Sequence, residues 1–311
     1  MHPAPSVILF TVLSGAGFGF LALLGVFGAS GTAAFFLWGL GYGMAVAGLV
    51  SSAFHLGNPR RALLAFTQWR TSWLSREAWA SVIALGLFAP QALADWLGFD
   101  WGQGFWGQGF WGRGFGIAGA VMAGVTVFAS AMIYAQIRAV PRWHHWTVPL
   151  VFLAYWATGG VVLAGVAPLA LPALCVLGGV LALHWHFGRH AFARAAETME
   201  SATGLGRIGA VSVFEQPHTG GNYLLREMIH VVGRKHAERV RMIAMVCSVM
   251  LPAMALAWLG GVTGAVLAAL THLLGALAQR WLFFAEAEHV VGLYYGQRGA
   301  GVASGSGGRA R

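Results

Sequence analysis

The sequence has few charged residues and almost no cysteine. Only 9% of its 311 residues are charged, whereas a soluble domain carries about a quarter, and the mean hydropathy is +0.67. This composition excludes an ordinary soluble protein. The two cysteines, Cys175 and Cys247, lie in separate apolar runs with no C-x-x-C pair. The chain therefore cannot ligate an iron–sulfur cluster with cysteines of its own, and we interpret both as small packing residues.

Long apolar runs are abundant instead. Runs of about 20 residues, the length that crosses a bilayer as a helix, recur along the chain. The N-terminus lacks the basic segment of a cleavable signal peptide, so we expect the first run to be a retained span. The sequence predicts an all-α fold, a polytopic integral membrane bundle of about eight transmembrane helices over residues 1–290. The expected spans are Ser6–Gly28, Ala33–Phe54, Ala78–Leu97, Phe115–Ile137, Thr147–Val166, Leu169–Phe187, Val240–Leu259 and Val262–Phe284.

The last two expected spans are separated only by Gly260 and Gly261. A single merged span or a re-entrant segment is the alternative interpretation of this region.

The distribution of basic residues predicts the orientation. Of the 19 Lys and Arg residues, only Arg113 falls on the side opposite to the two termini. Basic loops stay in the cytoplasm. We therefore expect a multi-pass protein of the inner (cytoplasmic) membrane, with both termini and all the basic loops cytoplasmic.

Three segments outside the spans have distinct compositions. Residues 101–115, WGQGFWGQGFWGRGF, predict an aromatic cap at the membrane interface. The loop 188–239 mixes both charge signs and is too long for a simple connection, so we interpret it as a docking surface. Binding of its amphipathic part, Asn222–Glu238, to lipid headgroups is the alternative. Residues 291–311 have the composition of a disordered tail.

A polar segment interrupts the apolar pattern between the second and third spans. Residues 55–79, HLGNPRRALLAFTQWRTSWLSREAW, contain four arginines, three tryptophans, one histidine and one glutamate. His55 is placed where one span ends and Glu77 where the next begins, so the two are expected to face each other at membrane depth. A quinone ring needs aromatic packing and hydrogen-bonding or proton partners, which histidine and a partly buried glutamate provide. The alternative is that the arginines only enforce topology and the tryptophans only anchor the interface.

The same segment resembles the signature of the dimethyl sulfoxide reductase membrane-anchor (DmsC-type) family, in which H-L-G-x-P leads to W-x-x-S-W-L-S-R-E. Two further segments, EQPHTGGNYLLREM (215–228) and RWLFFAEAEHVVGLYY (280–295), resemble the anchors of quinone-dependent sulfite dehydrogenases (SoeC-like). The resemblance implies an anchor that passes electrons from an iron–sulfur subunit to quinone. A related anchor that oxidises quinol for a dimethyl sulfoxide-type or other sulfur-compound reductase is the alternative.

The resemblance also implies cofactors and partners. Quinone would bind this chain, while a catalytic subunit would hold molybdopterin guanine dinucleotide and a ferredoxin-like subunit would hold iron–sulfur clusters. We expect membrane lipid and no nucleic acid as further partners. By position in the motif, the implied quinone-binding residues are His55, Glu77, Arg60, Trp69, Ser72, Trp73 and Arg76.

Histidines and acids elsewhere give weaker signals. His186 and His190 share a helix face, but without a nearby carboxylate or cysteine we expect no metal site. His272 has no clear partner at equal depth, because His184 is placed too near the membrane edge, so haem is not expected. Glu286, Glu288 and His289 follow the last span, where they form a proton path, a subunit-docking site or a solvated helix end.

A transporter is the main rival class. Transporters place polar groups near the bilayer midplane, whereas the ionisable residues here gather at one membrane edge. We therefore expect chemistry at that edge.

Overall fold

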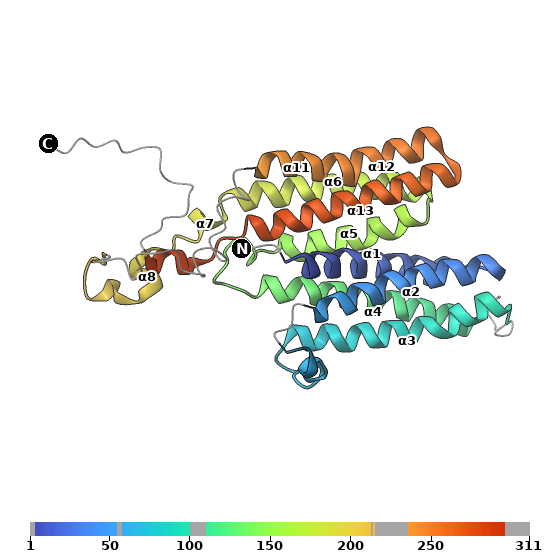
Figure 1. Cartoon of the computed structure of the whole chain (residues 1–311), viewed down its shortest axis with the longest axis horizontal. Coiled ribbons are helices and arrows are strands. Elements are labelled where there is room, and N and C mark those ends of the chain that lie inside the picture. Colours follow the sequence, from blue (N-terminus) through green and yellow to red (C-terminus); the bar gives the residue numbers. More distant parts are fainter. Residues whose placement is uncertain (1–3, 55–57, 100–109, 213, 215–235, 296–311) are drawn as a thin grey trace.

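The computed structural model describes residues 4–54, 58–99, 110–212, 214 and 236–295, and the described part of the chain is helical. Its long helices run back and forth as one bundle (Figure 1). They are α1 (Pro5–Phe27), α2 (Gly31–Ala53), α3 (Trp73–Leu97), α4 (Phe110–Ala135), α5 (Thr147–Leu163), α6 (Ala167–Arg189), the composite helix Ala237–Leu259 and α13 (Gly261–Ala285).

This architecture confirms the predicted polytopic helical bundle of about eight spans. Seven of the helices are long and apolar enough to cross a membrane. The remaining one, α5, has 17 residues, which gives a length of about 26 Å at 1.5 Å per residue. The protein is therefore a multi-pass membrane protein.

Two helices begin earlier than the hydropathy pattern indicates. α3 begins at Trp73 rather than near Ala78, so Glu77 lies inside the helix rather than before it. α4 begins at Phe110, and the last part of the aromatic repeat is thus helical. The rest of that repeat, residues 101–109, lies outside the described residues.

The glycine pair between the last two spans forms a tight turn. Gly260 and Gly261 have φ angles of +59° and +54°, which L-residues with side chains rarely adopt. The chain reverses there between two separate helices (Figure 1). A merged span is therefore excluded.

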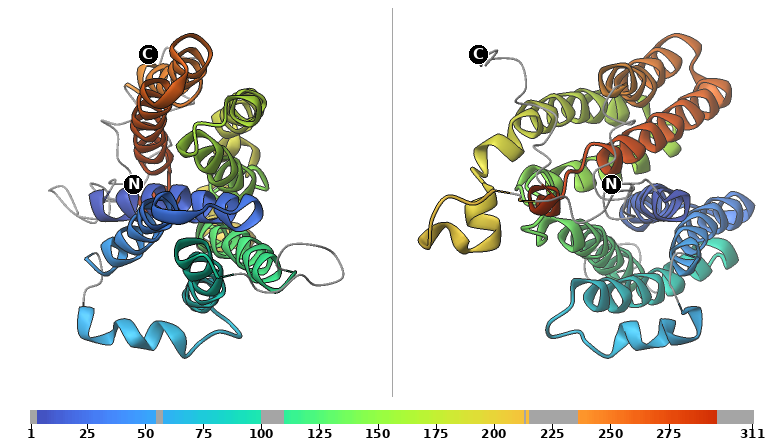
Figure 2. Two further views of the ribbon diagram at one scale, coloured as in Figure 1. Left: turned by 90° about the vertical axis from the view of Figure 1, so that its right-hand side faces the viewer. Right: turned by 60° about the vertical axis from the view of Figure 1, so that its left-hand side comes forward.

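Helix α1 lies at the centre of the bundle, between α2–α4 and the later helices (Figure 2). It is buried along most of its length. Its close approach to α5 depends on glycine, because a Cβ on Gly19 would lie 2.0 Å from the carbonyl oxygen of Trp156. Small residues at such crossings let membrane helices pack through their backbones.

Short helices gather at the end of the bundle where the described chain begins and ends (Figure 1); we call this the loop-rich end. They are η1 (Pro59–Phe66), α7 (Ala191–Arg194), α8 (Met199–Thr203), η2 (Leu205–Arg207) and η5 (Val290–Tyr295). The Tyr294 hydroxyl donates a hydrogen bond to the carbonyl of Ala202, so η5 fastens α8.

Parts of the predicted extramembrane segments fall among these short helices. η5 includes the first residues assigned to the C-terminal tail, and residues 296–311 lie outside the described residues. Most of the predicted amphipathic segment Asn222–Glu238 also lies outside them, with α11 (Ala237–Met245) beginning at its end.

Candidate functional site

Glu77 is a buried carboxyl group near the loop-rich end of α3. Only 3% of its surface is exposed. Its described hydrogen-bond partner is the hydroxyl of Ser130 on α4. No Lys, Arg or His within the described part of the chain forms an ion pair with it.

The hydroxyl of Ser130 can serve either protonation state of Glu77, because it also lies 3.1 Å from the carbonyl oxygen of Thr126. If Glu77 is ionised, Ser130 donates to its carboxylate. If Glu77 is protonated, it donates to Ser130, which then donates to the carbonyl. The carboxyl group can thus bind or release a proton without losing its hydrogen bond.

Glu77 lines a cavity of about 320 Å³, a size typical of small-molecule sites. We call it the carboxyl cavity. Its walls come from α1, α2, η1, α3 and α4, and are mainly apolar. The lining residues are Phe10, Leu49, Ser52, Ala53, Ala62, Ala65, Phe66, Leu74, Glu77, Ala78, Ser81, Val82, Ile133 and Tyr134.

The carboxyl cavity reaches the outer face of the bundle. Leu74 and Val82 line it yet are 46% and 51% exposed. η1 lies apart from the long helices, beyond α2 and α3, when the bundle is viewed end-on (Figure 2, left). An apolar molecule in the bilayer can therefore approach the carboxyl group from the side.

Tyr134 is the second polar group in this wall with an unoccupied function. Its hydroxyl forms no hydrogen bond to a described residue, while its ring packs edge-to-face against Trp143, Phe283 and Phe284. The aromatic packing fixes the ring and leaves the hydroxyl available to a ligand.

The remaining described residues of the predicted motif shape the chain beside the cavity rather than line it. The Arg76 guanidinium donates to the backbone carbonyls of Trp69, at 3.1 Å, and Arg70, at 2.7 Å. It also lies 4.4 Å from the centre of the Trp73 ring. Ser72 is the residue that precedes α3, and its side chain makes no capping hydrogen bond.

Trp79 ties η1 to α3. Its indole N–H donates to the carbonyl of Phe66 at 2.9 Å, and the two rings meet edge-to-face. Because Phe66 lines the carboxyl cavity, this contact holds one wall in place. His55 lies outside the described residues, as does the side chain of Arg60.

Glu286 is buried in a pair of ion pairs at the loop-rich end. Its carboxylate oxygens contact Arg142 from the loop before α5 and Arg241 from α11. Burial lowers the pKa of the Arg142 guanidinium, and the neighbouring Glu286 carboxylate opposes that shift. The arrangement joins three segments that are distant in sequence.

Glu288 and His289 are half-buried beside these ion pairs. The Nδ1 atom of His289 accepts a hydrogen bond from the N–H of Val291 at 3.0 Å.

The other histidines are held by hydrogen bonds inside the bundle. Nδ1 of buried His184 lies 2.9 Å from the hydroxyl of Thr147, and Nδ1 of buried His272 lies 2.8 Å from the carbonyl oxygen of Ser248. No cluster of three or more His, Cys, Asp or Glu with metal-binding geometry occurs among the described residues.

Sequence reasoning missed three polar residues that the fold makes prominent. Ser130 and Tyr134 are single polar residues in an apolar span, and four residues apart they share a helix face toward α3. Arg280 was assigned to the flank of the last span, but α13 continues to Ala285 and Arg280 is only 3% exposed.

Comparison with known proteins gives concordant matches. Residues 1–172 match the family model of the DMSO reductase anchor subunit (DmsC). The membrane-anchor relative found by the comparison, a sulfite dehydrogenase subunit from Allochromatium vinosum, is 33% identical over 325 residues, which cover 95% of this chain and 99% of that protein. No solved structure matches the chain.

Proposed function

Because this chain belongs to the DMSO reductase anchor subunit family, we propose that it is the quinone-reducing membrane subunit of a molybdenum-dependent sulfite dehydrogenase. The family supports the role of anchor in a multi-subunit oxidoreductase. The sulfite specificity rests on the similarity to the Allochromatium vinosum protein along nearly the whole chain.

The observation that carries the quinone site is the carboxyl cavity with Glu77 in its wall. Its volume suits a quinone ring, its apolar lining suits the ring faces, and its lateral opening suits an isoprenoid tail that remains in lipid. Glu77 supplies the protonatable group that quinone reduction requires, and Ser130 holds its carboxyl group in both protonation states.

Reduction of quinone takes up two electrons and two protons at its two oxygens. Glu77 delivers a proton to one oxygen, and the Tyr134 hydroxyl donates a hydrogen bond that polarises the same ring. His55, by its place in the family motif, is proposed as the partner of the second oxygen. Its neighbours Ser52 and Ala53 line the carboxyl cavity, and histidine exchanges protons near neutral pH.

Arg60, Arg76, Trp69, Ser72 and Trp73 are proposed to shape the approach to this site. The hydrogen bonds of Arg76 to two backbone carbonyls support such a role, since they fix the chain that leads into α3. General acid–base groups contribute only when they are held in hydrogen-bonding reach of the reacting atoms.

The loop-rich end is proposed to face the cytoplasm, because the basic residues gather there, and to dock a ferredoxin-like iron–sulfur subunit. That subunit would in turn connect to a catalytic subunit with molybdopterin guanine dinucleotide. Glu286 would hold the docking loop through its ion pairs, with Glu288 and His289 beside it as a docking or proton-exchange surface.

The second candidate function is the reverse reaction, quinol oxidation for a dimethyl sulfoxide-type reductase. The family name favours this interpretation, whereas the basic loops favour the cytoplasmic, sulfite-type arrangement. The same residues would serve either direction, since a group that delivers a proton to quinone also accepts one from quinol.

A pull-down of the tagged chain from native membranes in gentle detergent tests the anchor role. We expect a large molybdopterin subunit and a multi-cysteine ferredoxin-like subunit to remain bound and to be identified by mass spectrometry. The recovered complex should then reduce a quinone analogue with sulfite as donor. A chain that purifies alone from intact membranes would overturn the proposal.

A further inference from the structure

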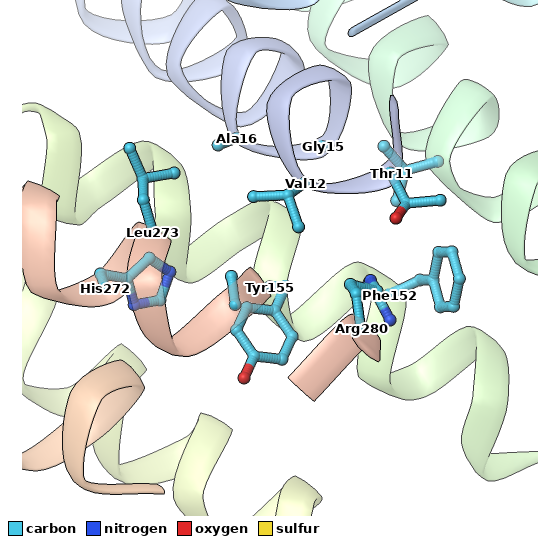
Figure 3. Close-up of a pocket in the computed structure, with 11 residues that line it drawn as sticks. Thr11, Val12, Gly15, Ala16, Phe152, Tyr155, His272, Leu273 and Arg280 are labelled. Atoms are coloured by element: carbon cyan, nitrogen blue, oxygen red, sulfur yellow. The ribbon is translucent and has the colours of Figure 1, made fainter. Parts of the chain in front are cut away.

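A second, smaller cavity lies inside the bundle where α1, α4, α5 and α13 meet (Figure 3). It measures about 20 Å³ and is lined by apolar residues together with Thr11, Tyr155, His272 and Arg280. We call it the interface cavity. A polar space of 10–15 Å³ or more can hold a water molecule, provided that two or more polar groups bind it.

Arg280 brings a full charge to this cavity without a counter-ion. Its guanidinium carbon lies 3.6 Å from the centre of the Phe152 ring and 5.5 Å from that of Tyr155. Among the described residues it forms neither an ion pair nor a hydrogen bond. Stacking on aromatic rings compensates part of the lost hydration, but the N–H groups still require acceptors.

His272 presents an acceptor to the same cavity. Its Nδ1 atom lies 2.8 Å from the carbonyl oxygen of Ser248. A carbonyl only accepts hydrogen bonds, so Nδ1 carries the proton and Nε2 carries a lone pair. Within the described part of the chain, Nε2 has no hydrogen-bond partner.

The partner of His272 belongs to an irregular turn of helix. Ser248 lies in a π-helical segment, Val246–Met250, and such turns occur preferentially at functional sites. The Ser248 hydroxyl is also 2.8 Å from the Tyr155 hydroxyl. One residue thus fixes both the tautomer of His272 and the ring of Tyr155 beside the cavity.

We propose that the interface cavity is a binding site for ordered water, which accepts hydrogen bonds from Arg280 and donates one to Nε2 of His272. Water fits both groups because it accepts and donates at once. An anion would satisfy Arg280 but would meet the lone pair of His272. The site is separate from the carboxyl cavity and does not depend on quinone chemistry.

The proposed water gives the bundle an internal hydrogen-bonded connection. It joins Arg280, whose charge reaches Tyr134 in the wall of the carboxyl cavity, to the His272–Ser248–Tyr155 cluster. Protons can be exchanged along such a connection, because each member both donates and accepts or is bound by a group that does.

A map of the intact complex in lipid nanodiscs, at a resolution where other buried waters are visible, tests the proposal. We expect one or two peaks within hydrogen-bonding distance of Arg280 and of Nε2 of His272. In a second map, of the Arg280→Met variant, we expect the peak beside residue 280 to be lost while the surrounding helices superimpose. Arg280→Lys is the matched control, which retains a donor and a peak.

Three results would overturn the proposal. The first is a wild-type map without a peak in the interface cavity. The second is a peak that grows stronger when chloride is exchanged for iodide, because it would identify an anion. The third is an unchanged peak in Arg280→Met. The wild-type map requires no variant to fold, and it decides the question regardless of whether the complex reduces quinone.

Discussion

Replacing Glu77 with glutamine tests whether this carboxyl group delivers protons to quinone. Glutamine has almost the same shape, and its amide can still form a hydrogen bond with the hydroxyl of Ser130. It cannot bind or release a proton near neutral pH. The change therefore removes proton transfer while preserving the walls of the carboxyl cavity.

General acid–base groups typically contribute a factor of about 10²–10⁴ to rate. We expect Glu77→Gln to lie at the lower end, because the Tyr134 hydroxyl in the same wall remains able to polarise the ring. The predicted loss is about 100-fold in kcat, which corresponds to about 2.7 kcal/mol of activation free energy.

The assay compares two electron acceptors for the purified complex. Sulfite-dependent reduction of a short-chain quinone analogue should fall about 100-fold in kcat, with KM changed less. Reduction of ferricyanide, which can take electrons from the iron–sulfur subunit directly, should stay unchanged. Equal loss with both acceptors would indicate disrupted assembly instead of a lost proton donor.

Asp95→Asn is the matched control. It makes the same carboxyl-to-amide change at the opposite end of the same helix, where Asp95 accepts hydrogen bonds from the Ala29 N–H and the Trp38 indole. Quinone reduction should remain within about threefold of wild type. A Glu77→Gln complex that keeps a third or more of its quinone-reducing activity would refute the assignment.

Three further perturbations probe the framework around this site. Ser130→Ala should slow quinone reduction about 10-fold, because a hydrogen bond to a charged group contributes about 1.5–3 kcal/mol; an unchanged pH–rate profile would contradict this. Glu286→Gln should destabilise the chain by about 3–5 kcal/mol, since it leaves two buried guanidinium groups without a counter-ion; a change below about 1 kcal/mol in denaturant unfolding would count against it. Gly19→Ala should reduce the yield of folded protein by forcing a Cβ against α5, whereas Gly43→Ala, with nothing within 4 Å, should not; gel filtration of both variants decides.

The eight spans could be predicted because crossing a bilayer requires a long, continuous apolar run. The beginning of α3 could not. Its first turn carries Arg76 and Glu77, whose polarity depresses local hydropathy, although the backbone is already helical from Trp73. Hydropathy therefore located the edge of the membrane better than the end of the helix, and Glu77 is buried where the pattern indicated an interfacial position.

The site itself could be predicted only in part. The motif pointed to Glu77, but Ser130 and Tyr134 come to it from α4 through tertiary packing, which no spacing in the sequence encodes. Arg280 illustrates the converse. A basic residue near the end of an apolar run usually marks the interface, yet here aromatic rings from α5 enclose it.

Two buried ionisable groups of opposite sign, Glu77 and Arg280, lie in this bundle without forming an ion pair. Tyr134 stands between them and is influenced by both charges. A direct pair would fix Glu77 as a carboxylate, because a nearby cation favours the charged form. Separation by an aromatic ring instead leaves Glu77 free to change its protonation state while Arg280 stays charged. The bundle can thus keep one fixed charge and one exchangeable proton close together, which is the arrangement that a proton-coupled electron acceptor at the carboxyl cavity requires.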